Sequence, residues 1–223
     1  MRALSSKSFR TALLAAAGAL LLLAPAVSAA TGARASVVGA GAPEVRSSLE
    51  SFLVPILPRP VLVRTGACPS DPSAQGCHTA GRRKDTIWLN PETGGLDGET
   101  VAHEMGHVFE SYMWDLRWHQ SHGSSFVPKN FGRMAAILFD HPGPGILYST
   151  AWSEQFAESY SACARLPELT ETLATGYWGF EMTPRQHDRI CPLIDRMARD
   201  YEAATAGDPS ILGAEALPLA PSP

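Results

Sequence analysis

The sequence predicts a single α+β domain that is mainly helical, carries a small sheet ahead of its central helix and is stapled by disulfides. Its 223 residues suit one domain of ordinary size, and 45% of them are apolar, which is enough for a packed core. Only 18% are charged, which argues against a wholly disordered chain. Two short β-type segments lie among five stretches of helical periodicity, and four cysteines can form the staples.

Residues 1–29 have the pattern of a signal peptide. Three basic residues within the first ten positions precede an apolar run of 14 residues, 11–24. This run is shorter than the roughly 20 residues of a membrane span, and small residues follow it up to Ala29. We therefore expect cleavage after Ala29 and a secreted chain without a stable membrane anchor. The alternative is an uncleaved anchor.

The charge balance excludes a nucleic-acid partner. The chain has 18 basic and 22 acidic residues, and loss of three basic residues with the signal segment leaves 15 against 22, a net charge of −7. The densest basic cluster, Arg82-Arg83-Lys84, is three residues long. A protein that binds nucleic acid normally carries a basic face.

Composition divides the exported part into three segments. Residues 30–42 are rich in Ala, Gly and Ser, which predicts a flexible leader. The structured domain is expected over 43–206, because the periodic segments all lie there. The Pro/Ala-rich tail, 207–223, predicts disorder.

The elements of the domain follow from periodicity, turn residues and capping residues. Asp97 and Thr150 are good N-caps for the second and fourth helices. Thr183 and Gln186 form a capping box with Pro184 at the first helical position of the last helix. The predicted helices cover residues 43–57, 98–114, 129–139, 151–165 and 184–204, and the predicted strands 60–65 and 85–90.

The four cysteines predict two disulfides, because their number is even and the chain is expected to be exported. Cys68 and Cys77 bracket a polar loop and would staple it locally. Cys163 and Cys191 would then tie two helices together. A zinc site made of four thiolates is the alternative, but the chain has no Cys-x-x-Cys pair.

The chemistry centres on the segment His103-Glu104-Met105-Gly106-His107. Residues four apart on a helix lie on one face, so the two imidazoles can hold one zinc ion. Glu104, offset by one residue, can act as a general base without displacing a ligand. The alternative is a pair of surface histidines. A separate apolar stripe would bury the helix: Val101, Met105, Val108 and Tyr112.

A third ligand is needed, because catalytic zinc usually has three from the protein. The third His of the longer zinc motif is absent, since Met113 stands in its place. Glu154 and Glu158 are four residues apart and share a helix face. Carboxylates near a helix start are also favoured by the helix dipole, so a solvated face is the alternative.

The two motifs together resemble the gluzincin branch of zinc metallopeptidases, with the closest pattern in anthrax lethal factor-like catalytic domains. These pair a His-Glu-x-x-His helix with a downstream Glu-x-Phe-Ala-Glu segment, as in residues 103–107 and 154–158 here. The resemblance covers about 103–158 and implies a zincin-like fold. It also implies one Zn²⁺ per chain, held by His103, His107 and Glu154, with Glu158 orienting a ligand histidine.

The resemblance further implies hydrolysis of a peptide or protein substrate. Zinc would activate water and polarise the peptide carbonyl, and Glu104 would carry the proton to the leaving amine. Tyr148 would stabilise the oxyanion. The exposed edge of the strand at 86–89 would align an extended substrate. We expect a monomer.

Two further functions stay open. A catalytically silent protein could use zinc as a clip within a binding scaffold, although such a site does not need Glu104. A zinc amidase could act on a cell-wall substrate by the same chemistry. Of the remaining residues, His78 receives no role. The tryptophans are expected in the core rather than on a substrate platform: Trp114, Trp118, Trp152 and Trp178.

Overall fold

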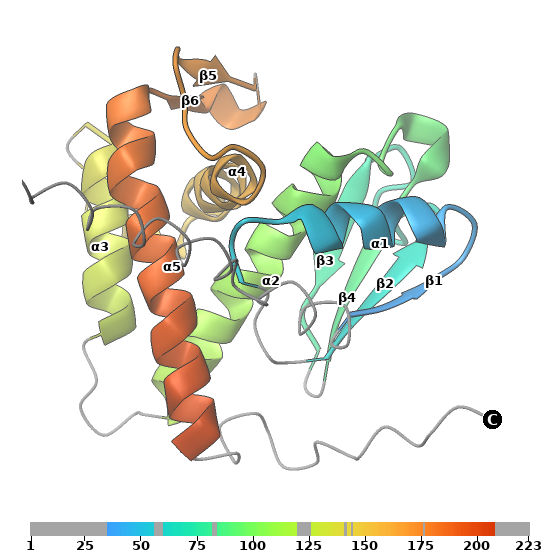
Figure 1. The fold of residues 1–223 in the computed structure, drawn as a ribbon, viewed down its shortest axis with the longest axis horizontal. Coiled ribbons are helices and arrows are strands. Elements are labelled where there is room, and N and C mark those ends of the chain that lie inside the picture. The colour runs from blue at the N-terminus through green and yellow to red at the C-terminus, as the bar shows by residue number, and fades with distance from the viewer. Residues whose placement is uncertain are drawn as a thin grey trace, which may run out of the picture.

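The protein has an α+β fold with five α-helices, a four-stranded sheet and a two-stranded sheet in the part of the chain described here. The computed structural model describes residues 35–55, 60–81, 84–119, 126–140, 142–143, 145–175 and 177–207. The predicted signal segment and most of the predicted tail lie outside these ranges. The sheet and the helical part of the molecule lie on either side of the long helix α2 (Figure 1).

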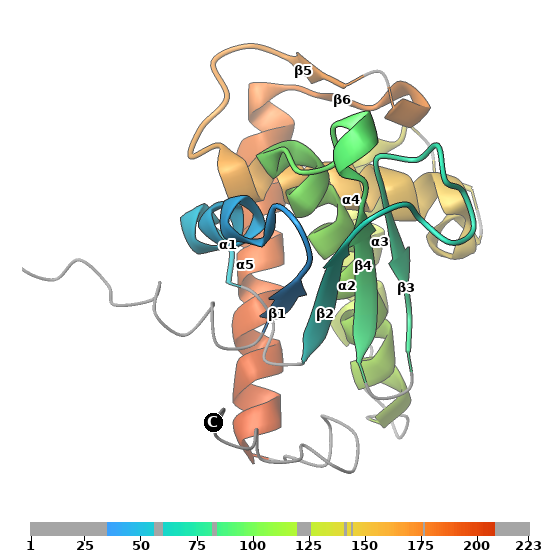
Figure 2. The same cartoon turned by 90° about the vertical axis from the view of Figure 1, so that its right-hand side faces the viewer.

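The larger sheet has the strand order β1-β2-β4-β3. Its strands are β1 (Ala35–Val38), β2 (Val61–Thr65), β4 (Asp85–Leu89) and β3 (Gly76–Thr79). The first three are parallel, and β3 is antiparallel to β4. Figure 2 shows them side by side in front of α2. The expected strand at 85–90 therefore has no exposed edge, because β2 and β3 flank it, and β3 forms the outer edge instead.

The predicted leader at 30–42 is wrong for its second half. Ala35–Val38 pairs with β2, and Val37 is buried in the core. The guanidinium of Arg46 also donates to the Val37 carbonyl at 3.0 Å. The Ala/Gly/Ser composition of this segment gave no sign of a strand. The strand forms by pairing with residues more than 20 positions away, and composition holds no information on such pairing.

Alternating burial shows which face of the sheet meets the core. In β4 the side chains of Asp85, Ile87 and Leu89 are buried and those between them are partly exposed. On the opposite face, Arg64 lies over the Trp88 ring at 5.3 Å. The buried face meets α2, which contacts both β3 and β4. Helix α1 (Ala42–Ser51) contacts β1 and α2.

Helix α2 (Gly98–His119) is the central element. Asp97 caps it as predicted, since its carboxylate accepts the Thr100 amide at 2.7 Å. The helix continues beyond the predicted end at Trp114. The predicted apolar stripe is buried throughout: Val101, Met105, Val108 and Tyr112.

Three more helices form the other half of the domain. They are α3 (Phe126–Leu138), α4 (Thr150–Arg165) and α5 (Pro184–Gly207). Between α4 and α5 lies a small hairpin of β5 (Leu173–Ala174) and β6 (Glu181–Met182). An aromatic cluster joins α2, α3 and α4, with ring centroids 5.2–5.6 Å apart: Trp114, Phe131, Trp152 and Phe156.

Several predicted helix boundaries differ in detail. Helix α1 ends at Ser51 rather than at 57, because the chain turns to extended backbone at Phe52 and the Leu53 amide donates to the Ala164 carbonyl. Ser149, not Thr150, caps α4 by accepting the Trp152 amide at 3.1 Å. The capping box of α5 is confirmed by reciprocal bonds between Thr183 and Gln186.

Both predicted disulfides are confirmed. Cys68 is bonded to Cys77, and Cys163 to Cys191. The first ties the start of β3 to the loop that follows β2, and the second joins α4 to α5. Among the described residues, no helix is long and apolar enough to cross a membrane.

Candidate metal centre

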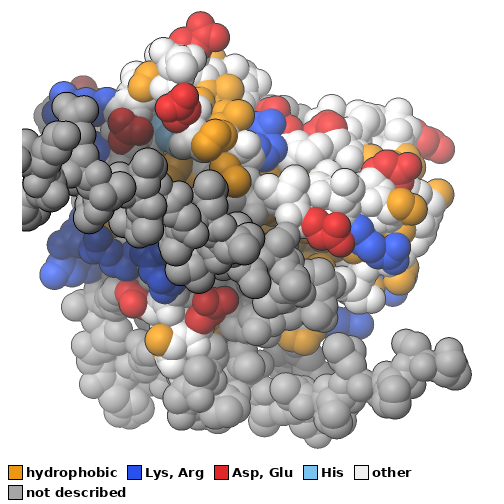
Figure 3. Space-filling view, in the orientation of Figure 1, with side chains coloured by type: hydrophobic (Ala, Val, Ile, Leu, Met, Phe, Trp, Pro, Cys, Tyr) orange, Lys and Arg blue, Asp and Glu red, His pale blue; other side chains and the backbone are white. Residues whose placement is uncertain are grey.

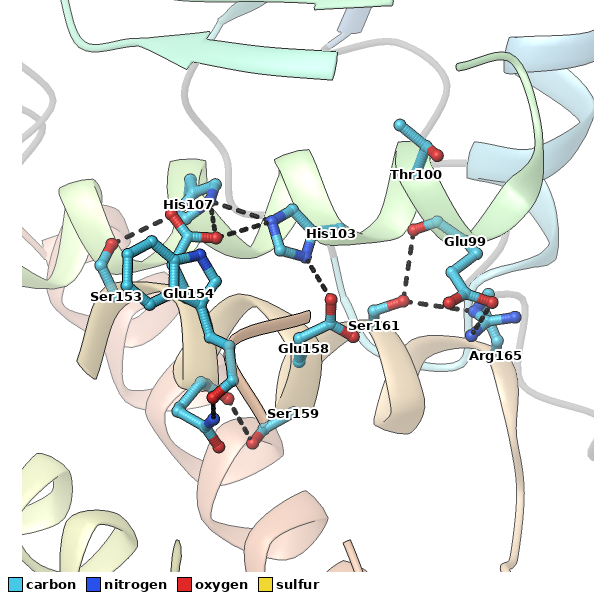
Figure 4. A network of polar contacts seen from close by, with 12 residues as sticks. Glu99, Thr100, His103, His107, Ser153, Glu154, Glu158, Ser159, Ser161 and Arg165 are labelled. Atoms are coloured by element: carbon cyan, nitrogen blue, oxygen red, sulfur yellow. Dashed lines mark hydrogen bonds and ion pairs between the residues drawn. The ribbon is translucent and has the colours of Figure 1, made fainter. Parts of the chain in front are cut away.

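Two helices bring the candidate ligands together. His103 and His107 lie one turn apart on α2, and Glu154 lies in the first turns of α4. Among the elements that the structure describes, α2 and α4 contact each other most extensively. Figure 4 shows the three side chains pointing toward one another across this interface.

Gly106 allows the helices to approach this closely. A Cβ at this position would lie 2.7 Å from the Ala157 Cα and 3.1 Å from the Tyr160 Cβ. Real Cβ atoms do not come so near to backbone, so any larger residue would push α4 away. Because Gly106 lies between the two histidines in sequence, the closest approach of α4 falls beside the candidate ligands.

The three ligand atoms form a compact triangle. The His103 Nε2 lies 3.1 Å from the His107 Nε2 and 3.3 Å from the Glu154 Oε2. The third side, from the His107 Nε2 to the Glu154 Oε2, is 3.7 Å. In a tetrahedral zinc site with bonds of about 2.0–2.1 Å, ligand atoms lie about 3.3 Å apart. The donor set and its spacing therefore fit a zinc ion.

The protonation of the metal-free site follows from this crowding. Burial by itself would lower the pKa of His103, but hydrogen bonds to Glu154 and Glu158 outweigh it and raise that pKa to about 10. For Glu154 the effects have the opposite signs. Burial by itself would raise the pKa of its carboxyl group, but hydrogen bonds to His103 and His107 lower that pKa to about 2. Both shifts favour a protonated His103 imidazole beside an ionised Glu154 carboxylate.

Each imidazole is held at its far nitrogen. The His103 Nδ1 donates to the Glu158 Oε1 at 3.1 Å. The His107 Nδ1 lies 3.2 Å from the Ser153 Oγ, and that hydroxyl donates to the Glu110 Oε2 at 2.6 Å. Both rings thereby turn the Nε2 toward the centre of the triangle, as a metal ligand requires.

Strand β3 covers helix α2. Gly76 pairs with Leu89 and His78 with Ile87 in the sheet register, and Leu89 and Ile87 belong to the buried face. Side chains at 76 and 78 therefore point toward α2. A Cβ on Gly76 would lie 2.6 Å from the Glu104 Oε1, so the carboxylate of Glu104 rests against this glycine.

His78 faces helix α2 from strand β3. Its ring is nearly parallel to that of His107, with centroids 6.2 Å apart. The His78 Nε2 is bonded to the Asp85 Oδ2 at 2.8 Å, and Asp85 is fully buried at the start of β4. This carboxylate fixes the orientation of the ring.

Glu104 has the environment of a general base. Only 5% of its surface is exposed, and burial raises the pKa of its carboxyl group, against the opposing effects of His107 and His103. Its Oε2 has no hydrogen-bond partner in the described part of the chain. A buried, unpartnered carboxylate oxygen beside three converging ligands is the place where a water or substrate atom would bind.

A cleft of about 990 Å³ opens over these groups. Its floor is formed by α2 and α4, and β3 forms one wall. At its far end Arg165 pairs with Glu99 at 3.1 Å. Acidic side chains dominate its charged lining: Asp71, Asp97, Glu99, Glu104, Glu154 and Glu158.

The structure places most of the predicted site residues in this cleft. The helices α2 and α4 bring together His103, Glu104, His107, Glu154 and Glu158. The backbone of Tyr148 lies in a short 3-10 helix, Ile146–Tyr148, just before α4, but its side chain is outside the described part.

Four residues of the site were missed from the sequence. Gly76 fell in the predicted loop between Cys68 and Cys77, and His78 directly after that loop, so nothing related either residue to α2. Ser153 precedes Glu154 directly, but its contact with His107 joins two helices, so no local signal pointed to it. Trp178 was expected in the core and is instead 59% exposed at the cleft.

No family model, curated protein or solved structure matches this chain at a significant level. A fold alone does not determine activity in any case. The geometry and chemistry of the cleft are therefore the features that indicate the function.

Proposed function

We propose that this chain is a secreted zinc metallopeptidase of the gluzincin type, with a zincin-like fold. One observation carries the proposal: the ligand atoms of His103, His107 and Glu154 all lie within 4.8 Å of one another, beside the unpartnered carboxylate oxygen of Glu104. A structural zinc site has no need of a buried base at this position. The two disulfides support export, because they persist in an oxidising compartment.

A bound zinc ion would supply a Lewis acid that polarises a carbonyl group and lowers the pKa of water. The protein's own part is positional. Glu104 would take the proton from the attacking water and pass it to the leaving amine. Its raised pKa suits this task, since the group must both accept and release a proton near neutral pH.

The walls of the cleft would position the substrate. The outer edge of β3 takes over the role first expected for β4, because it is the free edge of the sheet beside α2. An extended peptide can add to such an edge by backbone hydrogen bonds. Tyr148 keeps its proposed role as oxyanion donor.

The first test is zinc content by mass spectrometry on the exported domain, residues 30–223, produced with its disulfides formed. We expect one zinc per chain in the wild type and loss of zinc in Glu154→Ala. Glu99→Ala is the matched control, because Glu99 faces the same cleft but lies away from the ligands. No zinc in the wild type would overturn the proposal.

The second test separates peptidase from the other zinc functions. Glu104→Gln should keep zinc and lose cleavage of a peptide library by at least about 10²-fold, since it removes the base. Cleavage of peptidoglycan with no cleavage of peptides would show an amidase. Zinc binding without hydrolysis of either substrate would show a scaffold protein.

A further inference from the structure

One aromatic side chain at the cleft is not explained by the packing of the protein. Trp178 lies in the short helical turn Tyr177–Gly179 between β5 and β6, and 59% of its surface is exposed. It lines the same cleft as the candidate metal ligands. In the view of Figure 3, apolar side chains gather at the surface over this hairpin.

The backbone of Trp178 is also unfavourable for a bulky residue. Its φ is 49° and its ψ is 25°, in the left-handed region, and no other non-glycine residue of the described chain has a positive φ. Bulky residues rarely adopt this conformation, and such outliers concentrate at functional sites. If stability alone mattered, the exposed position and the left-handed backbone would both favour Gly or Asn over Trp at residue 178.

The turn is bonded to helix α4, which carries Glu154. The Trp178 carbonyl accepts the Gln155 side-chain amide at 3.0 Å, and Gln155 is buried directly after Glu154 in α4. Phe180 and Met182, which follow the turn, are buried in the core. The Trp178 backbone is therefore held against α4 at the residue next to Glu154, and Trp178 lines the cleft there, whereas β3 covers the α2 side.

The rest of the cleft offers little apolar surface. Apart from Trp178, its described lining consists of polar and charged side chains, glycines, one alanine and the disulfide-bonded Cys77. Apolar contact with a substrate must therefore fall mainly on this ring. An aromatic ring contributes a large contact area at low conformational cost.

We propose that Trp178 is a specificity-determining residue that packs against an apolar side chain next to the scissile bond of a peptide substrate. This inference rests on the proposed function, since it requires zinc to anchor the substrate beside Glu154. Residue 178 would then select substrates without taking part in proton transfer.

The test measures binding rather than turnover, by calorimetry on the zinc-loaded domain. The probes are glycine, leucine, phenylalanine and lysine hydroxamates, which share a metal-binding group and differ in the side chain. We expect leucine and phenylalanine hydroxamates to bind the wild type about tenfold more tightly than glycine hydroxamate, because part of the apolar side chain is buried on the indole. In Trp178→Ala this ratio should fall toward one, with glycine hydroxamate unaffected.

Two variants separate recognition from folding. Trp178→Gly suits the left-handed backbone, so it should melt no lower than Trp178→Ala and still lose the preference. Trp178→Phe should retain most of it. Leu53→Ala is the control, because it removes an exposed apolar side chain elsewhere and should leave the ratio unchanged.

The outcomes are distinguishable. An unchanged ratio in Trp178→Ala, or a wild type that prefers lysine hydroxamate, would overturn the assignment of an apolar partner. If no hydroxamate binds the zinc-loaded wild type, the metal centre itself fails, and both the proposed function and this inference are overturned.

Discussion

The orientation of His107 depends on the Ser153 hydroxyl group, which belongs to the neighbouring helix α4. Ser153 accepts a hydrogen bond from the His107 Nδ1 and donates one to the buried Glu110. This relay crosses from α2 to α4 and back, so it couples the ligand to the packing of both helices. A group that holds a ligand ring in this way commonly affects metal affinity without touching the metal.

We expect Ser153→Ala to weaken zinc binding about 10- to 100-fold, because His107 loses the partner of its far nitrogen. Competition with a fluorescent zinc chelator measures the change. Ser159→Ala is the matched control on α4, since the Ser159 hydroxyl donates only to the Gln155 carbonyl of its own helix. Equal zinc affinity of both variants would show that the relay is not needed.

Gly76 determines where the carboxylate of Glu104 can lie. The Cβ of an alanine would overlap the Glu104 side chain, so Gly76→Ala should shift the base by a fraction of an ångström. We expect zinc content to be retained and kcat to fall by up to about 10²-fold, because proton transfer depends on geometry. KM should change little.

Gly132→Ala serves as the control for this variant, because the added Cβ on α3 meets nothing in the described chain within 4 Å beyond its own helix backbone. It should leave kcat unchanged. A Gly76→Ala protein with normal kcat would mean that Glu104 adjusts freely, and the contact with β3 would then have no part in catalysis.

At the level of elements, the spacing between α2 and α4 determines whether a three-ligand site exists. Glu154 belongs to one helix and both histidines to the other, and the helices touch at Gly106 and Ala157. Aromatic contacts of Phe109 with Phe156 and Tyr160 continue the same interface. The fold thus sets the ligand geometry through packing rather than through a loop.

We expect Gly106→Ala to lower the free energy of unfolding by about 1–3 kcal/mol, because its methyl group would overpack this interface. Zinc affinity should fall as well, since α4 carries Glu154 away from the histidines. Urea unfolding with and without zinc measures both effects. Gly98→Ala at the start of α2, where the new Cβ meets only a Ser48 Oγ at 3.7 Å, should show neither loss.

Several features that depend on local signals were predicted correctly, although the cap of α4 and the end of α1 were not. The caps formed by Asp97 and by Thr183 with Gln186 act within one helical turn. The two disulfides follow from only three possible pairings of four cysteines. Strands β1 and β3 were not predicted, because they are four residues long and owe their structure to partners elsewhere in the sheet. Short strands carry too little periodicity to identify alone.

For the whole molecule, the metal-free site makes stability depend on pH. The raised pKa of His103 adds stability that is complete below its usual value of 6.5 and is lost as the pH rises through about 10. The lowered pKa of Glu154 adds stability that is complete above 4.5 and is lost as the pH falls toward about 2. The two windows overlap between pH 4.5 and 6.5.

We therefore expect Glu154→Gln to destabilise the metal-free protein most between pH 4.5 and 6.5, with a smaller loss on either side. Urea unfolding of both proteins in the presence of a chelator, from pH 3 to 10, measures the difference in their free energies of unfolding. Titrating groups that the two proteins share cancel in this difference. Glu99→Gln is the control, since Glu99 lines the same cleft but pairs with Arg165 rather than with a histidine. A loss that is constant with pH would contradict the coupling of Glu154 to His103.

The sequence by itself determined the candidate ligands on α2, the carboxylates on α4, the disulfide pairing and the α+β class. These follow from spacing along one helix or from the identity of single residues. Only the tertiary structure decided what surrounds them: β3 over Glu104, the Ser153 relay, His78 with Asp85, and the exposed ring of Trp178. Each of these contacts joins separate elements, and the free energy that places them comes from packing across the whole domain, which no local pattern records.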